Sequence, residues 1–138
     1  MSMFELLVGL SVLGILTTAA VQTWSRFADR VAVEAAQGTV LNAYRRAQSA
    51  ARAWGRPSEV TVSTDSIVIR TVGIADTVVL WRAPGPARTG VLLTPANHVS
   101  SFGASGLATG VANVSHVLQR GATRRTVVVS RLGRVRVR

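Results

Sequence analysis

The sequence contains no cysteine and no lysine, and only six acidic residues stand against sixteen arginines. Without cysteine the chain has no disulfides, no thiolate metal sites and no cysteine nucleophile. The two histidines, His98 and His116, have no acid at a metal-ligand spacing, so we expect each at the surface or hydrogen-bonded in the core. The few carboxylates form no pair suited to general acid–base catalysis. We therefore expect no enzyme, no metal and no other cofactor.

The positive charge is concentrated near the C-terminus. The formal net charge is +10, and residues 120–138 contribute +7 of it through seven arginines and no acid. A polyanion is the natural partner of so basic a segment. A solvated face that keeps the protein soluble is the alternative, and composition alone leaves both open.

A long apolar run lies close to the N-terminus. Residues 6–21 contain no charged side chain, while Glu5 stands at the edge of the run. As a helix, this stretch is just long enough to span a bilayer. A carboxylate at such a place is costly unless it finds a partner or reaches the interface. Glu5 is therefore a candidate functional residue.

The helical pattern continues beyond the apolar run. No proline occurs from Val21 to Trp54, and Gly55 followed by Pro57 predicts the end of a helix. Apolar residues recur at helical spacing at Val33, Ala36, Val40, Tyr44, Ala47, Ala51 and Trp54. One helix over residues 2–54 would be about 80 Å long, which is too long for a compact domain of this size. We therefore expect its first half to protrude, into a membrane or into other copies of the chain.

After Pro57 the apolar period changes to two, which is typical of strands. The candidate strands are Val60–Ser63, Ile67–Val72, Thr77–Trp81, Val91–Thr94, Val111–Leu118, Thr126–Ser130 and Arg134–Arg138. No helical pattern separates them, so we expect antiparallel pairing. The predicted fold is α+β, a long N-terminal α-helix packed on an antiparallel all-β head. Its parts are a hydrophobic transmembrane or filament-core helix (residues 1–25) and a globular head (26–138), in which an amphipathic helix (26–54) precedes the β-region (58–138).

Both ends of the chain resemble one protein superfamily. The stretch MSMFELLVGLSVLGIL resembles the mature N-terminus of type IV pilins and type II secretion pseudopilins, where glutamate is fifth and glycine usually stands near position fourteen. Here these residues are Glu5 and Gly14, so we expect Met1 to be the mature N-terminus after removal of a leader peptide. Segments 102–110 and 127–136 resemble the GspH/FimT branch of minor pilins and pseudopilins.

The resemblance implies a role for the N-terminal residues. In the family, the glutamate that matches Glu5 neutralises the methylated amino terminus of an adjacent subunit, here Met1, during filament assembly. The alternative is that Glu5 only extends to the headgroup boundary of a membrane. Met1 replaces the usual phenylalanine, and Gln22 stands where many pilins have proline. We therefore expect Gly9 and Gly14 to be the flexible points of the helix.

The arginines near the C-terminus form a second candidate site. Strand alternation places Arg134, Arg136 and Arg138 on one face, about 6.6 Å apart, close to the phosphate spacing of an extended nucleic-acid strand. Arg120, Arg124 and Arg125 would widen this patch if segments 126–130 and 134–138 pair. In the FimT-like branch a Gly-Arg-x-Arg motif is tied to DNA capture for natural transformation, and it matches Gly133, Arg134 and Arg136.

Two simpler interpretations of the arginines remain open. The arginine row can be an edge strand protected from aggregation by its charge, or it can pair with acids of neighbouring subunits. The sequence therefore predicts a pilin-like structural subunit of a type IV filament. The alternatives are a DNA-binding, FimT-like pilin for natural transformation and a type II secretion pseudopilin.

These interpretations imply particular partners and locations. The expected partners are other pilin subunits, the inner membrane before assembly and, for the DNA-binding alternative, DNA. The expected location is a single-pass position in the bacterial inner membrane, followed by an extracellular or periplasmic filament.

Overall fold

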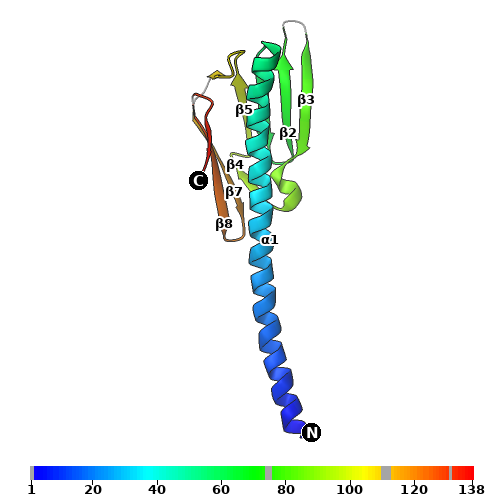
Figure 1. Ribbon diagram of the computed structural model, residues 1–138. Helices are drawn as coiled ribbons and strands as arrows, with labels where there is room; N and C mark the ends of the chain where they lie inside the picture. Colours follow the sequence, from blue (N-terminus) through cyan, green and yellow to red (C-terminus); the bar gives the residue numbers. More distant parts are fainter. Residues whose placement is uncertain (1, 74–75, 110–112, 131) are drawn as a thin grey trace.

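A computed structural model describes residues 2–73, 76–109, 113–130 and 132–138, apart from the side chains of residues 16 and 18–20 (Figure 1). One helix comes first, and strands follow. In chain order the elements are α1 (Met3–Trp54), β1 (Ser58–Ser63), β2 (Ser66–Val72), β3 (Thr77–Pro84), the 3-10 helix η1 (Pro86–Thr89), β4 (Leu92–Thr94), β5 (Asn97–Phe102), β6 (Ala108–Thr109), β7 (Val114–Arg120), β8 (Thr123–Val129) and β9 (Val135–Val137). The predicted α+β fold is confirmed.

Helix α1 is continuous over 52 residues, or about 80 Å. Ser2 is its N-cap: its Oγ accepts the N–H of Phe4 at 3.3 Å, and its own N–H donates to Glu5 Oε2 at 3.0 Å. The helix ends where predicted, at Gly55, which adopts the left-handed conformation (φ 60°) and donates its N–H to the Ala51 carbonyl. No break occurs at Gln22.

The strands form two antiparallel sheets. The first has the order β3-β2-β1-β5-β6, and the second has the order β4-β7-β8-β9. Figure 1 shows the upper half of α1 lying across both sheets, with β2 and β3 on one side of it and β7 and β8 on the other. The lower half of the helix extends away from the sheets, as expected for a helix longer than its domain.

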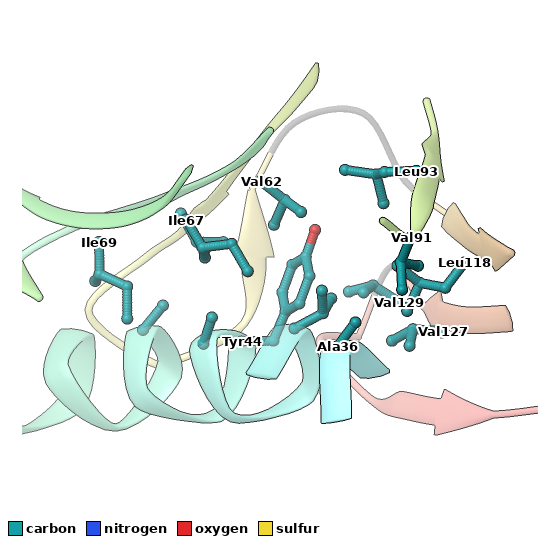
Figure 2. Packing of buried hydrophobic residues seen from close by; sticks show 14 of the residues in the cluster. Ala36, Tyr44, Val62, Ile67, Ile69, Val91, Leu93, Leu118, Val127 and Val129 are labelled. Carbon is teal, nitrogen blue, oxygen red and sulfur yellow. The ribbon is translucent and has the colours of Figure 1, made fainter. Parts of the chain in front are cut away.

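The core lies between the upper half of α1 and the two sheets. The helix contributes mainly small side chains, which let the sheets approach it closely: Ala32, Val33, Ala36, Val40, Ala43, Ala47 and Ala51. Tyr44 is the exception, and Figure 2 shows it rising from the helix between Val62 of the first sheet and Val129 of the second. Its ring meets Phe102 edge to face, with centroids 6.2 Å apart.

Several strands differ from the sequence prediction: β6 was not expected, and β8 begins three residues before the predicted Thr126. Strand β5 was not expected, yet it lies inside the first sheet, where it pairs with β1 on one side and β6 on the other. The strand expected from Val111 begins at Val114 in the described part of the chain, and residues 110–112 lie outside it.

Candidate assembly stem and arginine face

The first part of α1 has an apolar surface that the rest of the chain does not cover. We call residues 3–31 the stem. Phe4 is 73% exposed and Trp24 is 72% exposed. The other exposed large apolar side chains of the stem are Met3, Leu6, Leu7, Val8, Leu10, Val12, Leu13, Ile15, Val21, Phe27 and Val31. An apolar surface of this extent marks a site of interaction, because monomeric proteins rarely expose one.

The stem includes most of the segment that the sequence predicts as a transmembrane or filament-core helix, residues 1–25. Across the described residues, no helix combines the length and the hydropathy of a membrane span. Two hydroxyl groups of the stem bond to the backbone of their own helix. Ser11 donates its hydroxyl to the Leu7 carbonyl at 2.8 Å, and Thr17 donates to the Leu13 carbonyl at 3.0 Å.

Glu5 is engaged within its own chain. Its carboxylate accepts the Ser2 N–H, so it completes a capping box at the start of the helix. Met1, its predicted partner from a neighbouring subunit, lies outside the described residues, and the ion pair stays a prediction. Gly9 and Gly14 lie within the unbroken helix with open space around them, and their flexibility also stays a prediction.

The stem joins the head at a polar clamp. Arg120, at the end of β7, holds Asp29 of the helix with Nε 3.0 Å from Oδ1, and its Nη1 donates to the Thr89 carbonyl at 2.7 Å. Gly121 follows with φ 54°, and a Cβ at this position would overlap the Asp29 carboxylate. The clamp therefore ties the β7–β8 turn and η1 to the helix just before the core begins at Ala32.

The β8–β9 pairing sets the direction of the C-terminal arginines. Arg136 lies opposite Val128, and Arg138 and Thr126 exchange both backbone hydrogen bonds at 2.8 and 2.9 Å. Val127 and Val129 point into the core, so the alternate positions point outward. Arg124, Arg134, Arg136 and Arg138 are exposed on this outer side, and we call them the arginine face. The predicted pairing of the two segments is confirmed, and the shared face of Arg134, Arg136 and Arg138 follows from strand alternation.

Arg120 and Arg125 do not belong to this face, which corrects the sequence prediction. Arg125 pairs with Leu118, a fully buried residue, and both side chains therefore point toward the helix. There Arg125 Nη2 lies 3.9 Å from Glu34 Oε1, while Arg120 contacts Asp29. Adjacent strand residues point to opposite faces, so Arg124 and Arg125 cannot widen the same patch.

Gly133 has a structural role in the motif that it shares with Arg134 and Arg136. It is buried in the turn before β9 with φ 74°, and a Cβ there would lie 2.8 Å from Gln48 Nε2. The same Gln48 nitrogen donates to the Gly133 carbonyl. The glycine therefore lets the turn press on the helix and so positions the arginine face.

The two histidines, which are far apart in the sequence, come together at the edge of the core, where His116 is fully buried and His98 is partly buried. Their ring centroids are 5.8 Å apart, and His116 Nε2 lies 2.7 Å from the Tyr44 hydroxyl, which also lies 3.1 Å from Ser100 Oγ. Burial lowers the pKa of His116 to about 4 and raises the pKa of Tyr44 to about 12. The Nδ1 atom of His116 has no hydrogen-bond partner among the described residues.

Sequence reasoning did not find this cluster, because its members lie on α1, β5 and β7 and only the packing of both sheets on the helix brings them together. It does not resemble a metal centre. In the part of the chain that the structure describes, no group of three or more histidine or acidic side chains is placed to hold an ion.

No protein-family model matches the chain, and no curated protein sequence matches it significantly. Two solved structures resemble it, both crystal structures of the type IV minor pilin FimU of Pseudomonas aeruginosa PAO1. The structure in space group P21 has a TM-score of 0.58 at 14% identity and covers 79% of this chain and 87% of FimU. The structure in space group P65 has a TM-score of 0.56 at 15% identity and covers 79% and 91%. The chain therefore has the fold of a type IV pilin.

Proposed function

We propose that this chain is a pilin-like structural subunit of a type IV filament, of the GspH/FimT-like kind. The observation that carries the proposal is the stem, a helical rod about 40 Å long whose large apolar side chains are exposed. Other stems can cover such a surface, because neighbouring helices bury apolar side chains against one another. The likeness of the fold to FimU, a minor pilin, supports the same conclusion.

Glu5 is proposed to fix the position of a neighbouring stem. One of its oxygens already caps its own helix through Ser2. A carboxylate and an α-ammonium group stabilise each other strongly in an apolar setting, whereas either alone is penalised. Glu5 would therefore pair with the amino group of Met1 from an adjacent copy once other stems exclude water.

Two substitutions separate this role from helix capping. Glu5→Gln removes the charge but keeps an oxygen that accepts the Ser2 N–H, and Glu5→Ala removes both. We expect both variants to fold normally, as judged by circular dichroism, but to be absent from filaments counted by electron microscopy. Ser2→Ala is the matched control, because it weakens the cap and leaves the carboxylate in place. Normal filaments of the Glu5→Gln variant would contradict the ion pair.

DNA binding is a second candidate function, and the arrangement of the arginine face favours it. Arg134, Arg136 and Arg138 follow one another on the outer side of an edge strand, with Arg124 beside them on β8. The arginines that contact carboxylates, Arg120 and Arg125, point the other way. Such a row suits phosphate groups, so binding would be independent of sequence and sensitive to salt.

The test compares two pairs of arginines in the full chain. Arg134→Gln with Arg136→Gln removes two charges from the face, while Arg45→Gln with Arg82→Gln removes two exposed charges elsewhere. We expect the first pair to reduce the slope of log affinity against log salt by about 2, and the control pair to leave it nearly unchanged. Equal effects of the two pairs in fluorescence anisotropy would show that net charge, and not this face, binds DNA.

A further inference from the structure

The edge strands of the two sheets are not protected equally. Among the described residues, the edge strands β4, β6 and β9 are two or three residues long, whereas the edge strand β3 has eight. Proteins usually protect long edges from other chains with charges, prolines or bulges. The second half of β3 has all three, because Leu80 is the extra residue of a bulge and Arg82 and Pro84 follow it. Residues 77–79, the first half, carry no charge and no proline.

The backbone of residues 77–79 presents hydrogen-bonding groups at the open edge. Figure 1 shows β3 on the outer side of β2, away from α1. The Asp76 carbonyl accepts the Gly73 N–H at 2.8 Å, so the backbone of Asp76 faces β2. Backbone groups alternate in direction along a strand, so those of Val78 also face β2, whereas those of Thr77 and Val79 face away from it. Two N–H and two C=O groups therefore lie along this short edge.

The side chains at the same edge are apolar and only half covered. Val78 is 49% exposed and Val79 is 50% exposed. Val78 pairs with Thr71 and Val79 pairs with Arg70, so the two valines lie on opposite faces of the sheet. A strand added beside residues 77–79 would cover both valines and would also bond to the free backbone groups.

The distribution of charge favours this edge as a meeting place for two copies of the chain. Residues 58–84, which include β1, β2 and β3, contain three acids and two arginines, whereas residues 85–138 contain eight arginines and no acid. Figure 1 shows β2 and β3 on one side of α1 and β7 and β8 on the other. Two copies that meet at β3 therefore keep their basic sheets far apart, so the repulsion between them is weak.

A second copy also supplies a matching set of backbone groups. In an antiparallel pairing centred on Val78, Thr77 of each copy lies opposite Val79 of the other. Both residues present an N–H and a C=O at the edge, so the two copies can exchange four hydrogen bonds. Each copy uses the same residues, so the contact is isologous and closes after two copies.

We propose that two copies of this chain pair through residues 77–79 of β3, so that their five-stranded sheets join into one continuous sheet. The contact is small beside the roughly 800 Å² that each partner contributes to a standard interface, so a single pair is weakly bound. Strand β3 runs along α1, and an antiparallel pairing therefore points the two stems in opposite directions (Figure 1). The contact is thus separate from the stem contacts of the proposed filament and goes beyond that function.

A single introduced cysteine tests the contact, because the chain has no cysteine of its own. In the proposed register the two Val78 residues are directly opposite each other, and their backbones do not bond to one another. Their Cα atoms are then about 4.5 Å apart, a distance that a disulfide spans. We expect the full-length Val78→Cys variant to form a disulfide-linked dimer on a non-reducing gel after mild oxidation.

Val79→Cys is the matched control, because Val79 is as exposed as Val78. In the proposed register the two Val79 residues are diagonal neighbours about 7–8 Å apart, which exceeds the usual Cα separation of a disulfide. The Val79→Cys variant should therefore give about tenfold less dimer than Val78→Cys.

Two further changes block the contact in the Val78→Cys chain. Val79→Pro removes an N–H that faces the open edge, so no hydrogen bond between β2 and β3 is lost. Thr77→Arg with Val79→Arg keeps every backbone N–H and places like charges opposite each other across the contact. We expect each change to reduce the dimer to the level of the Val79→Cys control. Circular dichroism should show that the fold is kept, and the arginine variant decides the test if the proline variant unfolds.

Three results would overturn the proposal. They are the absence of dimer from the Val78→Cys variant, an equal amount of dimer from Val79→Cys, and a dimer that persists in a folded blocking variant.

Discussion

The two halves of α1 share one continuous backbone but have opposite surroundings. From Ala32 to Ala51 the side that faces the sheets carries mostly alanine and valine, and these side chains are buried. In the stem the apolar side chains are larger, and they are exposed. Small residues mark the half that packs within its own chain, where sheets must come close. Large residues mark the half that the described part of its own chain leaves uncovered.

The difference also concerns what stabilises each half. The upper half is stabilised by tertiary packing on two sheets, whereas most of the stem relies on its own hydrogen bonds and its cap, with the Asp29–Arg120 ion pair at its upper end. Stability of the fold should therefore depend on the head alone, and assembly should depend on the stem. The following substitutions test that division.

The largest difference in stability is expected between two aromatic substitutions, one in each half of α1. Tyr44→Ala removes a fully buried ring from the core and should lower the free energy of unfolding by about 3–5 kcal/mol. Trp24→Ala removes a larger but exposed ring and should change it by less than about 0.5 kcal/mol. Urea denaturation followed by circular dichroism measures both. A similar loss of unfolding free energy in the two variants would show that the stem contributes to the stability of the fold as much as the head does.

The next effect is a loss of head stability in acid. Burial holds the pKa of His116 at about 4 in the folded chain, below its ordinary value of 6.5, and lowers the pKa of His98 in the same direction. The unfolded chain therefore binds more protons between these values, so stability is complete above about pH 6.5 and is lost as the pH falls toward 4. The loss from His116 should be on the order of 3 kcal/mol.

His116→Gln supplies the control for the acid effect. Glutamine does not titrate, so this variant should lack most of the pH dependence between 6.5 and 4, although its stability at neutral pH is lower. Denaturation curves at several pH values give the comparison. If the free energy of unfolding of the His116→Gln variant fell with pH as steeply as that of the wild type, another group would cause the acid effect.

A smaller effect is expected at the clamp, where the two halves meet. Gly121→Ala places a Cβ against the Asp29 carboxylate at a positive φ and should cost about 1–2 kcal/mol. Asp29→Ala loses a half-exposed ion pair worth about 1 kcal/mol or less. In the double variant no Asp29 carboxylate overlaps the new Cβ at position 121. The loss of unfolding free energy should therefore be smaller than the sum of the losses in the two single variants. Strict additivity in a double-mutant cycle would show that Gly121 and Asp29 do not interact.

The smallest effect is expected at the free end of the stem. Ser2→Ala removes the N-cap and should weaken the first helical turn by about 1 kcal/mol, without changing the melting temperature of the head. Faster hydrogen exchange of the first amides of α1 would report the loss. A lower melting temperature would show that the stem and the head unfold together.

Local signals in the sequence predicted the long helix and most of the strands. Gly55 and Pro57 mark the helix end, and alternating valines and isoleucines mark β1 and β2. Strand β5 escaped prediction because its inward side carries His98 and Ser100, polar residues that do not produce an apolar alternation. Their burial makes sense only beside Tyr44 and His116, which belong to other elements.

The candidate sites were likewise predictable only where local signals in the sequence determine them. The exposed stem and the common face of Arg134 and Arg136 follow from length and periodicity. The separation of Arg124 from Arg125 needed the position of the core relative to β8, since alternation alone does not say which residue faces the helix.

The placement of α1 across both sheets has a mechanical consequence. A load on the stem enters the head along the helix axis, and the buried residues from Val33 to Ala51 lie in line with it. Those contacts must slide together rather than open one after another, and the Arg120 clamp lies at the point where the load enters. The head is thus loaded in shear, the direction in which a packed helix resists best.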